Sequence, residues 1–110
     1  SGGSNPSITY RNLYYNEQAI DDISGNKPAG VYALKFNSLV NAEQQPLNMI
    51  YIDWGDTNTQ AITGVDHHPD SGNPHVFYHY YSSSPVGKTI TIKIWDNWGK
   101  TQTITRTITN

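Results

Sequence analysis

Residues 89–95 read Thr-Ile-Thr-Ile-Lys-Ile-Trp, and this strict alternation decides the fold of the chain. A side-chain period of two predicts a half-buried β-strand with its isoleucines on one face and the residues between them on the other. Residues 101–109 continue the pattern, with threonine at every odd position. The short loop at residues 96–99, Asp-Asn-Trp-Gly, joins the two stretches, so they are expected to form a β-hairpin.

The rest of the chain divides into short stretches separated by polar turns. β-Branched and aromatic residues, which suit a pleated and half-buried surface, concentrate in these stretches. Further strands are expected over residues 7–18, 31–36, 49–54, 59–65 and 75–81. Residues 66–74 hold two prolines and a glycine and are expected to be irregular. Short strands without a helical period indicate an all-β, immunoglobulin-like antiparallel β-sandwich of about seven strands.

Length and composition bound the organisation of the chain. Its 110 residues suit one domain, with residues 7–110 as a single sandwich and residues 1–6 as a cloning scar or linker. A net charge of −2 without a basic patch argues against a nucleic-acid partner. No apolar run is long enough for this segment to insert into a membrane. The absence of cysteine excludes disulfides, thiolate nucleophiles and thiolate metal sites.

Three segments, in order along the chain, carry a resemblance to a known family. They are Ile-Tyr-Ile-Asp-Trp-Gly-Asp at residues 50–56, His-Tyr-Tyr at 79–81 and Ile-Thr-Ile-Lys-Ile-Trp-Asp-Asn-Trp-Gly at 90–99. Together they resemble the PKD (polycystic kidney disease) domain, as found in bacterial and archaeal cell-surface and secreted proteins, over about residues 31–109. Thr57 departs from the pattern, because that family usually has glycine at this position.

The resemblance implies a β-sandwich that occurs in tandem and spaces, adheres, or assists a neighbouring catalytic domain. The chain is therefore expected to be a non-catalytic spacer, adhesion or protein-interaction module of a larger protein, located at the cell surface or outside the cell. The alternative is a carbohydrate- or polymer-binding accessory domain of a secreted enzyme. The expected partners are neighbouring domains of the parent chain and a protein or polysaccharide ligand.

The residues that match the family motif also have a structural interpretation. Asp53 and Asp56 flank a tight turn and are expected to accept backbone N–H bonds, while Trp54 is expected to anchor the core or its rim. His79 shares a strand face with Tyr81 and is expected to be partly buried and hydrogen-bonded. A direct role in ligand binding is the alternative. The full set of motif residues is Asp53, Trp54, Gly55, Asp56, His79, Tyr81, Asp96, Asn97 and Gly99.

The four histidines of the chain cluster between residues 67 and 79. Histidine together with carboxylate can bind zinc or nickel, and the candidates are His67, His68, His75 and Asp70. The adjacent His67 and His68 cannot easily aim at one ion, so a polar loop is the alternative and no cofactor is expected. Calcium needs several oxygen ligands, for which the candidates are Asp53, Asp56 and Asp96.

The sequence offers no constellation typical of catalysis. The serines at residues 82–84 lack the Gly-x-Ser-x-Gly elbow of a nucleophile. Asp21 and Asp22 lie in a polar stretch without the apolar pocket that acid–base chemistry requires. The chain is therefore not expected to be an enzyme.

Aromatic residues provide the strongest binding signal. Strict alternation cannot turn all of them inward, namely Tyr14, Tyr15, Tyr78, Tyr80, Trp95 and Trp98. Flat rings suit sugar rings or peptide side chains, so Tyr80, Trp95 and Trp98 form the candidate ligand surface. The alternative is that these rings cover a sheet or contact a neighbouring domain.

Overall fold

The computed structural model describes residues 5–20, 27–39, 47–67 and 75–109, and these residues form two antiparallel sheets of four strands each. No α-helix occurs within these ranges, and no helix in this part of the chain is long and apolar enough to span a bilayer. The strands are β1 (Ser7–Tyr15), β2 (Gln18–Ala19), β3 (Gly30–Leu39), β4 (Leu47–Asp53), β5 (Thr59–His67), β6 (His75–Tyr81), β7 (Thr89–Asp96) and β8 (Thr101–Thr107).

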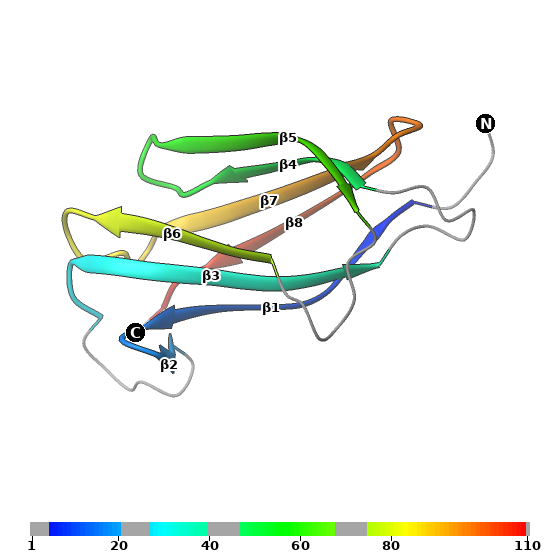
Figure 1. Cartoon of the computed structure of the whole chain (residues 1–110). Helices are drawn as coiled ribbons and strands as arrows, with labels where there is room; N and C mark the ends of the chain where they lie inside the picture. Colours follow the sequence, from blue (N-terminus) through cyan, green and yellow to red (C-terminus); the bar gives the residue numbers. More distant parts are fainter. Residues whose placement is uncertain (1–4, 21–26, 40–46, 68–74, 110) are drawn as a thin grey trace.

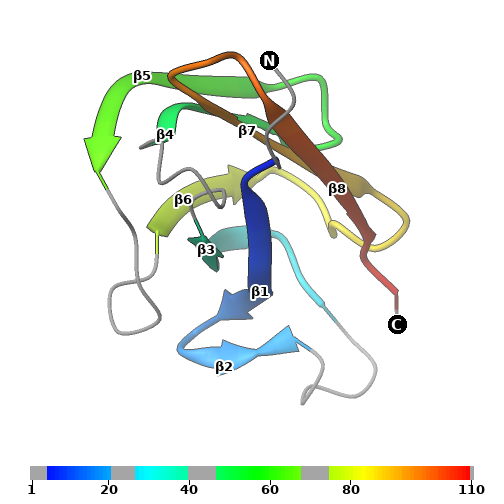
Figure 2. The same ribbon diagram turned by 90° about the vertical axis from the view of Figure 1, so that its right-hand side faces the viewer.

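The two sheets lie one above the other as separate layers (Figures 1 and 2). Sheet A has the order β2-β1-β3-β6, and sheet B has the order β5-β4-β7-β8. The chain therefore changes sheet between β3 and β4, between β5 and β6, and between β6 and β7. The expected hairpin of β7 and β8 is confirmed, with Ile92 opposite Ile104.

One apolar core fills the space between the layers. On β7, Ile90, Ile92 and Ile94 are almost fully buried, whereas the residues between them are partly exposed, as the alternation predicts. Sheet A contributes Tyr32, Leu34 and Phe36 of β3 from the opposite side. Removing this much apolar surface from water is the main driving force for folding of a domain this small.

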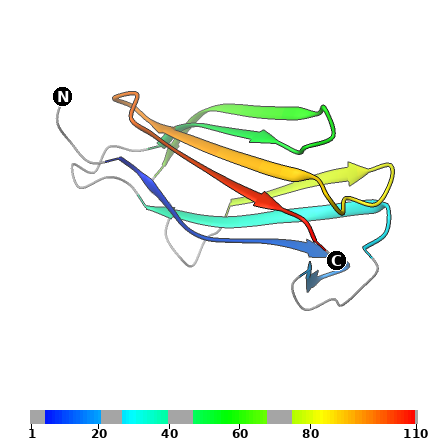
Figure 3. The same cartoon turned by 180° about the vertical axis from the view of Figure 1, so that it is seen from behind.

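Side-chain hydrogen bonds between β1 and β8 join the two layers along one side of the sandwich. The backbone N–H of Ile8 donates to Oε1 of Gln102, and Nη1 of Arg106 donates to Oδ1 of Asn12 at 3.1 Å. β1 and β8 lie side by side and point the same way in Figure 3. Strands from different sheets are thus connected without a backbone ladder between them.

The structure differs from the sequence prediction in the number of strands. Eight strands occur in the described residues instead of about seven, because residues 7–18 are not one irregular strand. Asn16 and Glu17 both have positive φ, 51° and 65°, and reverse the chain so that β2 pairs back onto β1. An Asn-Glu pair lacks the glycine that usually marks this type of turn, so the sequence did not indicate it.

The boundary of the predicted irregular segment 66–74 is also wrong at its start. β5 continues through Asp66 to His67, because Leu47 of β4 pairs with His67 and extends the ladder. Residues 68–74 lie outside the described part of the chain. Pro6, the last residue of the predicted linker, is buried directly before β1.

Candidate functional site

The turn after β4 is built by Asp53 and Asp56, the two aspartates of the first motif segment. The backbone N–H of Gly55 donates to Oδ1 of Asp53 at 2.9 Å, and the N–H of Asn58 donates to Oδ1 of Asp56 at 3.1 Å. Trp54 N–H closes the turn by donating to the carbonyl of Asn58 at 3.1 Å. The predicted backbone hydrogen bonds of both aspartates are confirmed, and short polar side chains favour such turns for this reason.

Trp54, His79 and Asp56 form a connected group beneath this turn. The Trp54 side chain is buried, and the His79 ring stacks on it with centroids 4.7 Å apart and planes 11° apart. His79 Nε2 donates to Oδ2 of Asp56 at 2.7 Å, and both side chains are only 15% exposed. The predicted partial burial and hydrogen bonding of His79 are confirmed, and β6 is thereby tied to the turn of the other sheet.

Hydrogen bonds keep the Asp56 carboxylate charged. Burial raises its pKa, but hydrogen bonds from His79 and Asn58 outweigh burial and hold the pKa below its ordinary value. Both carboxylate oxygens already have a partner inside the protein. Asp56 is therefore an ionised acceptor with a fixed orientation at neutral pH.

Tyr81 makes a second bond between the sheets, which the sequence did not reveal. Its buried hydroxyl donates to the carbonyl of Trp54 at 2.8 Å, and its ring packs edge-on against His79 with centroids 4.8 Å apart. The Tyr81 position was visible in the motif, but the carbonyl that accepts its bond can be found only once the two sheets are stacked.

Alkaline pH is expected to destabilise the protein through Tyr81. Burial, followed by the nearby charge of Asp56, raises the pKa of Tyr81 well above its usual range. The neutral hydroxyl is thus favoured in the folded state. Its contribution to the free energy of unfolding is complete below about pH 10 and is lost as the pH rises further. Urea unfolding between pH 8 and pH 11 should show a falling free energy of unfolding, and Tyr81→Phe should make that slope shallower. Tyr32, whose pKa is also raised by burial, should leave a residual slope in the variant.

Asp96 organises the hairpin turn at the opposite end of the molecule. Its buried carboxylate oxygen Oδ1 accepts the N–H groups of Trp98 and Lys100, both at 2.9 Å. The Gly99 N–H donates to the Asp96 carbonyl at 3.1 Å, while Asn97 remains exposed. Residues 96–99, the end of the third motif segment, therefore form a turn, as residues 53–56 of the first segment do.

Two residues of the first turn have left-handed backbone conformations. Gly55 has φ +82°, and a Cβ placed on it would lie 2.5 Å from the carbonyl oxygen of Thr89. Thr57 has φ +73°, where glycine would be free of strain and a β-branched residue is a true outlier. Strain of this kind is found most often at binding and switching sites.

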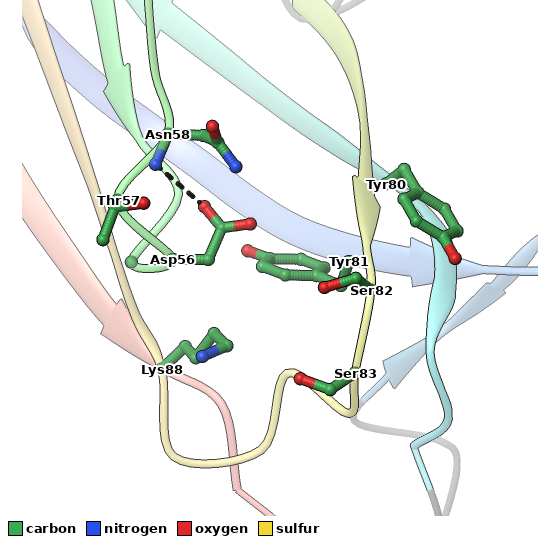
Figure 4. Close-up of a pocket in the computed structure, with 9 residues that line it drawn as sticks. Asp56, Thr57, Asn58, Tyr80, Tyr81, Ser82, Ser83 and Lys88 are labelled. Carbon is green, nitrogen blue, oxygen red and sulfur yellow. Dashed lines mark hydrogen bonds between the residues drawn. The ribbon is translucent and has the colours of Figure 1, made fainter.

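The same turn borders a polar hollow of about 420 Å³, which we call the turn hollow (Figure 4). Its polar lining comes from the turn after β4, from the loop after β6 and from the residue before β7. These lining residues are Asp56, Thr57, Asn58, Ser82, Ser83 and Lys88. In Figure 4 the Asp56–Asn58 turn stands on one side of the hollow and Ser82 and Ser83 on the other.

A second surface covers the outer side of sheet A. We call it the tyrosine face, and it consists of Tyr14, Val31, Ala33, Val76, Tyr78 and Tyr80. Tyr14, Ala33 and Tyr78 occupy neighbouring positions across three strands, and Val31 pairs with Tyr80 in the next row. Tyr78 is 69% exposed, Tyr80 60% and Val31 53%. Period-two alternation on residues 31–36 and 75–81 places Val31 and Ala33 on one face of their strand, and Val76, Tyr78 and Tyr80 on one face of theirs. The pairing of these strands, which joins the two sets into one face, is seen only in the structure.

Lysine and a small depression complete the tyrosine face. Lys35 Nζ lies 4.6 Å from the centroid of the Tyr14 ring. A hollow of about 270 Å³ lies between Tyr14, Val31, Lys35 and Tyr78. The face thus combines flat rings with one cation above a ring.

The structure does not bring the predicted ligand surface of Tyr80, Trp95 and Trp98 together. Tyr80 lies on the outer side of sheet A, whereas Trp95 lies on the outer side of sheet B, where Lys93 Nζ is 4.6 Å from its ring centroid. Trp98 is exposed in the β7–β8 turn, and this turn lies at the opposite end of the sandwich from the point where β6 ends (Figure 1). The three residues do not form one surface, because Tyr80 and Trp95 face outward from different sheets and Trp98 belongs to a turn.

The described histidines point to different partners. His75 is buried and packs against Phe36 with ring centroids 4.9 Å apart, while His79 stacks on Trp54. His67 ends β5, and the candidates His68 and Asp70 lie outside the described residues. Among the residues that the structure describes, no group of three or more histidine or carboxylate side chains is close enough to hold a metal ion.

Comparisons with known proteins add no relative to this picture. No family model, curated protein or solved structure matches the chain.

Proposed function

We propose that this chain is a non-catalytic adhesion module of the PKD type, with an immunoglobulin-like topology, in a larger extracellular or cell-surface protein. The strand order supports the topology. In immunoglobulin-like sandwiches strands A, B and E lie in one sheet and strands C, F and G in the other. Here β1, β3 and β6 share sheet A, and β4, β7 and β8 share sheet B. β5 then corresponds to the extra C′ strand beside strand C.

The use of the motif residues supports a non-catalytic role. Asp53, Asp56 and Asp96 all accept backbone N–H bonds in turns, which occupies one oxygen of each carboxylate and fixes its position. His79 is held between Asp56 and the Trp54 ring. These side chains stabilise the turns between strands and the contacts between the two sheets.

The exposed tyrosine face is the observation that carries the adhesion function. A row of flat rings and valines on the outer side of a sheet is unusual, because soluble domains generally expose apolar side chains singly. Tyrosine offers a large contact area at low conformational cost and is enriched where proteins bind partners.

Replacing both Tyr78 and Tyr80 by serine is expected to weaken adhesion by about tenfold or more, because central aromatic residues carry most of the binding energy of a surface. The test is retention of the protein on insoluble cellulose, chitin and xylan and on collagen fibres. Trp98→Ser is the matched control, since it removes an exposed aromatic ring from the other end of the molecule and should leave retention unchanged. Equal retention of the double variant and the unsubstituted protein on every matrix would contradict the proposal.

A carbohydrate-binding accessory domain is the second candidate. Tyr78 and Tyr80 stand two residues apart on one face, about 7 Å along the strand, which suits stacking on successive sugar rings. Tyr80 also borders the turn hollow. Retention on a polysaccharide but not on collagen would favour this candidate, and the reverse would favour protein adhesion.

A further inference from the structure

We propose that the turn hollow is a binding site for one sugar unit of a neutral glycan. The inference deepens the carbohydrate form of the proposed function and rests on it. The site is distinct from the tyrosine face, because its lining is polar and comes from loops at one end of the sandwich. Its volume of about 420 Å³ falls in the ordinary range of small-molecule sites.

The lining matches the hydrogen bonding of a polyol. Asp56 only accepts hydrogen bonds, Lys88 only donates them, and the hydroxyls of Thr57, Ser82 and Ser83 do both. A sugar hydroxyl also donates one bond and accepts others, so a ring with several hydroxyls can satisfy this mixed set.

The charges of the lining favour a neutral ligand. One carboxylate, Asp56, and one ammonium, Lys88, border the same hollow. An anion would be attracted by Lys88 but repelled by Asp56, and a cation would be attracted by Asp56 but repelled by Lys88. A neutral ligand can form strong hydrogen bonds with both groups and brings no charge that either group would repel.

Asp56 is preorganised to act as such a partner. Its oxygens accept bonds from His79 at 2.7 Å, from the Asn58 N–H at 3.1 Å and from the Asn58 side chain. Two carboxylate oxygens offer about four lone-pair sites, so Asp56 keeps room for one more donor. His79 is itself fixed by stacking on the buried Trp54. A carboxylate held in this way loses little freedom when a ligand binds.

Thr57 provides a second and independent argument. Its φ of +73° is strained for a β-branched residue, and glycine would remove the strain. In Figure 4 the Thr57 side chain stands at the edge of the hollow. The strain is explained if the hydroxyl is needed for a ligand, since the turn itself would be more stable with glycine.

Tyr80 lies between the turn hollow and the tyrosine face. It is among the residues that line the hollow, but in Figure 4 its ring points to the other side of β6 and so belongs to the tyrosine face. The hollow is therefore proposed to bind its sugar unit without the Tyr80 ring. The polar lining of the turn hollow would determine which sugar, and which end of the glycan, is accepted.

Thr57→Gly tests the inference, because it should improve folding and weaken binding together. The probes are cellohexaose, xylohexaose, mannohexaose and chitohexaose, titrated to millimolar concentration while backbone amide NMR shifts are followed. With at least one hexaose, the amides of Thr57 and Ser83 should shift and saturate. Thr57→Gly should raise the urea midpoint and bind that hexaose about tenfold more weakly, which corresponds to the loss of one good hydrogen bond.

Three further variants separate this site from the rest of the molecule. Thr57→Ser keeps the hydroxyl and should retain binding, whereas Ser83→Ala should weaken binding as Thr57→Gly does. Thr103→Ala removes an exposed hydroxyl from sheet B and should have no effect. Full binding by Thr57→Gly and Ser83→Ala, or no shift with any hexaose, would overturn the inference. The adhesion function would still stand in either case if the Tyr78 and Tyr80 double variant loses retention.

Discussion

Replacing Trp54 by alanine is expected to lower the free energy of unfolding by about 3–5 kcal/mol. The indole is the largest of the fully buried side chains. It stacks on the His79 ring and makes a T-shaped contact with Tyr81, with ring centroids 6.4 Å apart. Its removal leaves a cavity at the joint between the two sheets. Since domains of this size are stable by only about 5–15 kcal/mol, the expected loss is about a fifth or more of the total.

Trp98→Ala is the matched control for this substitution. It makes the same chemical change at a side chain that is 52% exposed in the hairpin turn. Its effect should stay within about 0.5 kcal/mol, as for most surface substitutions. Urea unfolding followed by circular dichroism measures both variants, and equal losses would show that Trp54 is not a core anchor.

Replacing Gly55 by alanine is expected to cost about 2–5 kcal/mol. The new methyl group would lie 2.5 Å from the backbone oxygen of Thr89, which cannot move aside as a flexible side chain could. The positive φ of Gly55 adds the ordinary strain of a left-handed residue. Both effects act at the turn that holds Asp53 and Asp56 in place.

Gly99→Ala separates the two effects. Gly99 has the same φ of +82° as Gly55, but a Cβ built on it meets nothing within 4 Å. Only the left-handed strain applies there, so the cost should be about 1–2 kcal/mol. If the two glycine variants lose equal stability in urea, the close approach of Gly55 to Thr89 has no energetic weight.

The sequence predicts the elements of this fold well because most strands show a clear period of two. β6 begins and ends where the pattern of residues 75–81 places it, and β7 differs by one residue. The β1–β2 reversal was missed, since Asn16 and Glu17 adopt positive φ without a glycine. Strand alternation reports which face a side chain occupies, but it does not report which strands become neighbours.

The candidate site was predictable in its parts and not in its assembly. The turn bonds of Asp53 and Asp56 are local, so a sequence motif can indicate them. The bonds from Tyr81 to Trp54 and from His79 to Asp56 span 27 and 23 residues and cross between sheets. The tyrosine face likewise depends on β1, β3 and β6 being adjacent, which only the topology decides.

The joining of β1 to β8 has a mechanical consequence. β1 starts at one end of the sandwich and β8 finishes at the other, and both strands run in the same direction (Figure 3). Tension on the first and last strands would therefore slide them past each other in shear, with the Gln102 and Arg106 contacts and the β1–β3 ladder loaded at the same time. Bonds loaded together must break together, so resistance to pulling is governed by a high barrier to unfolding and not by equilibrium stability alone.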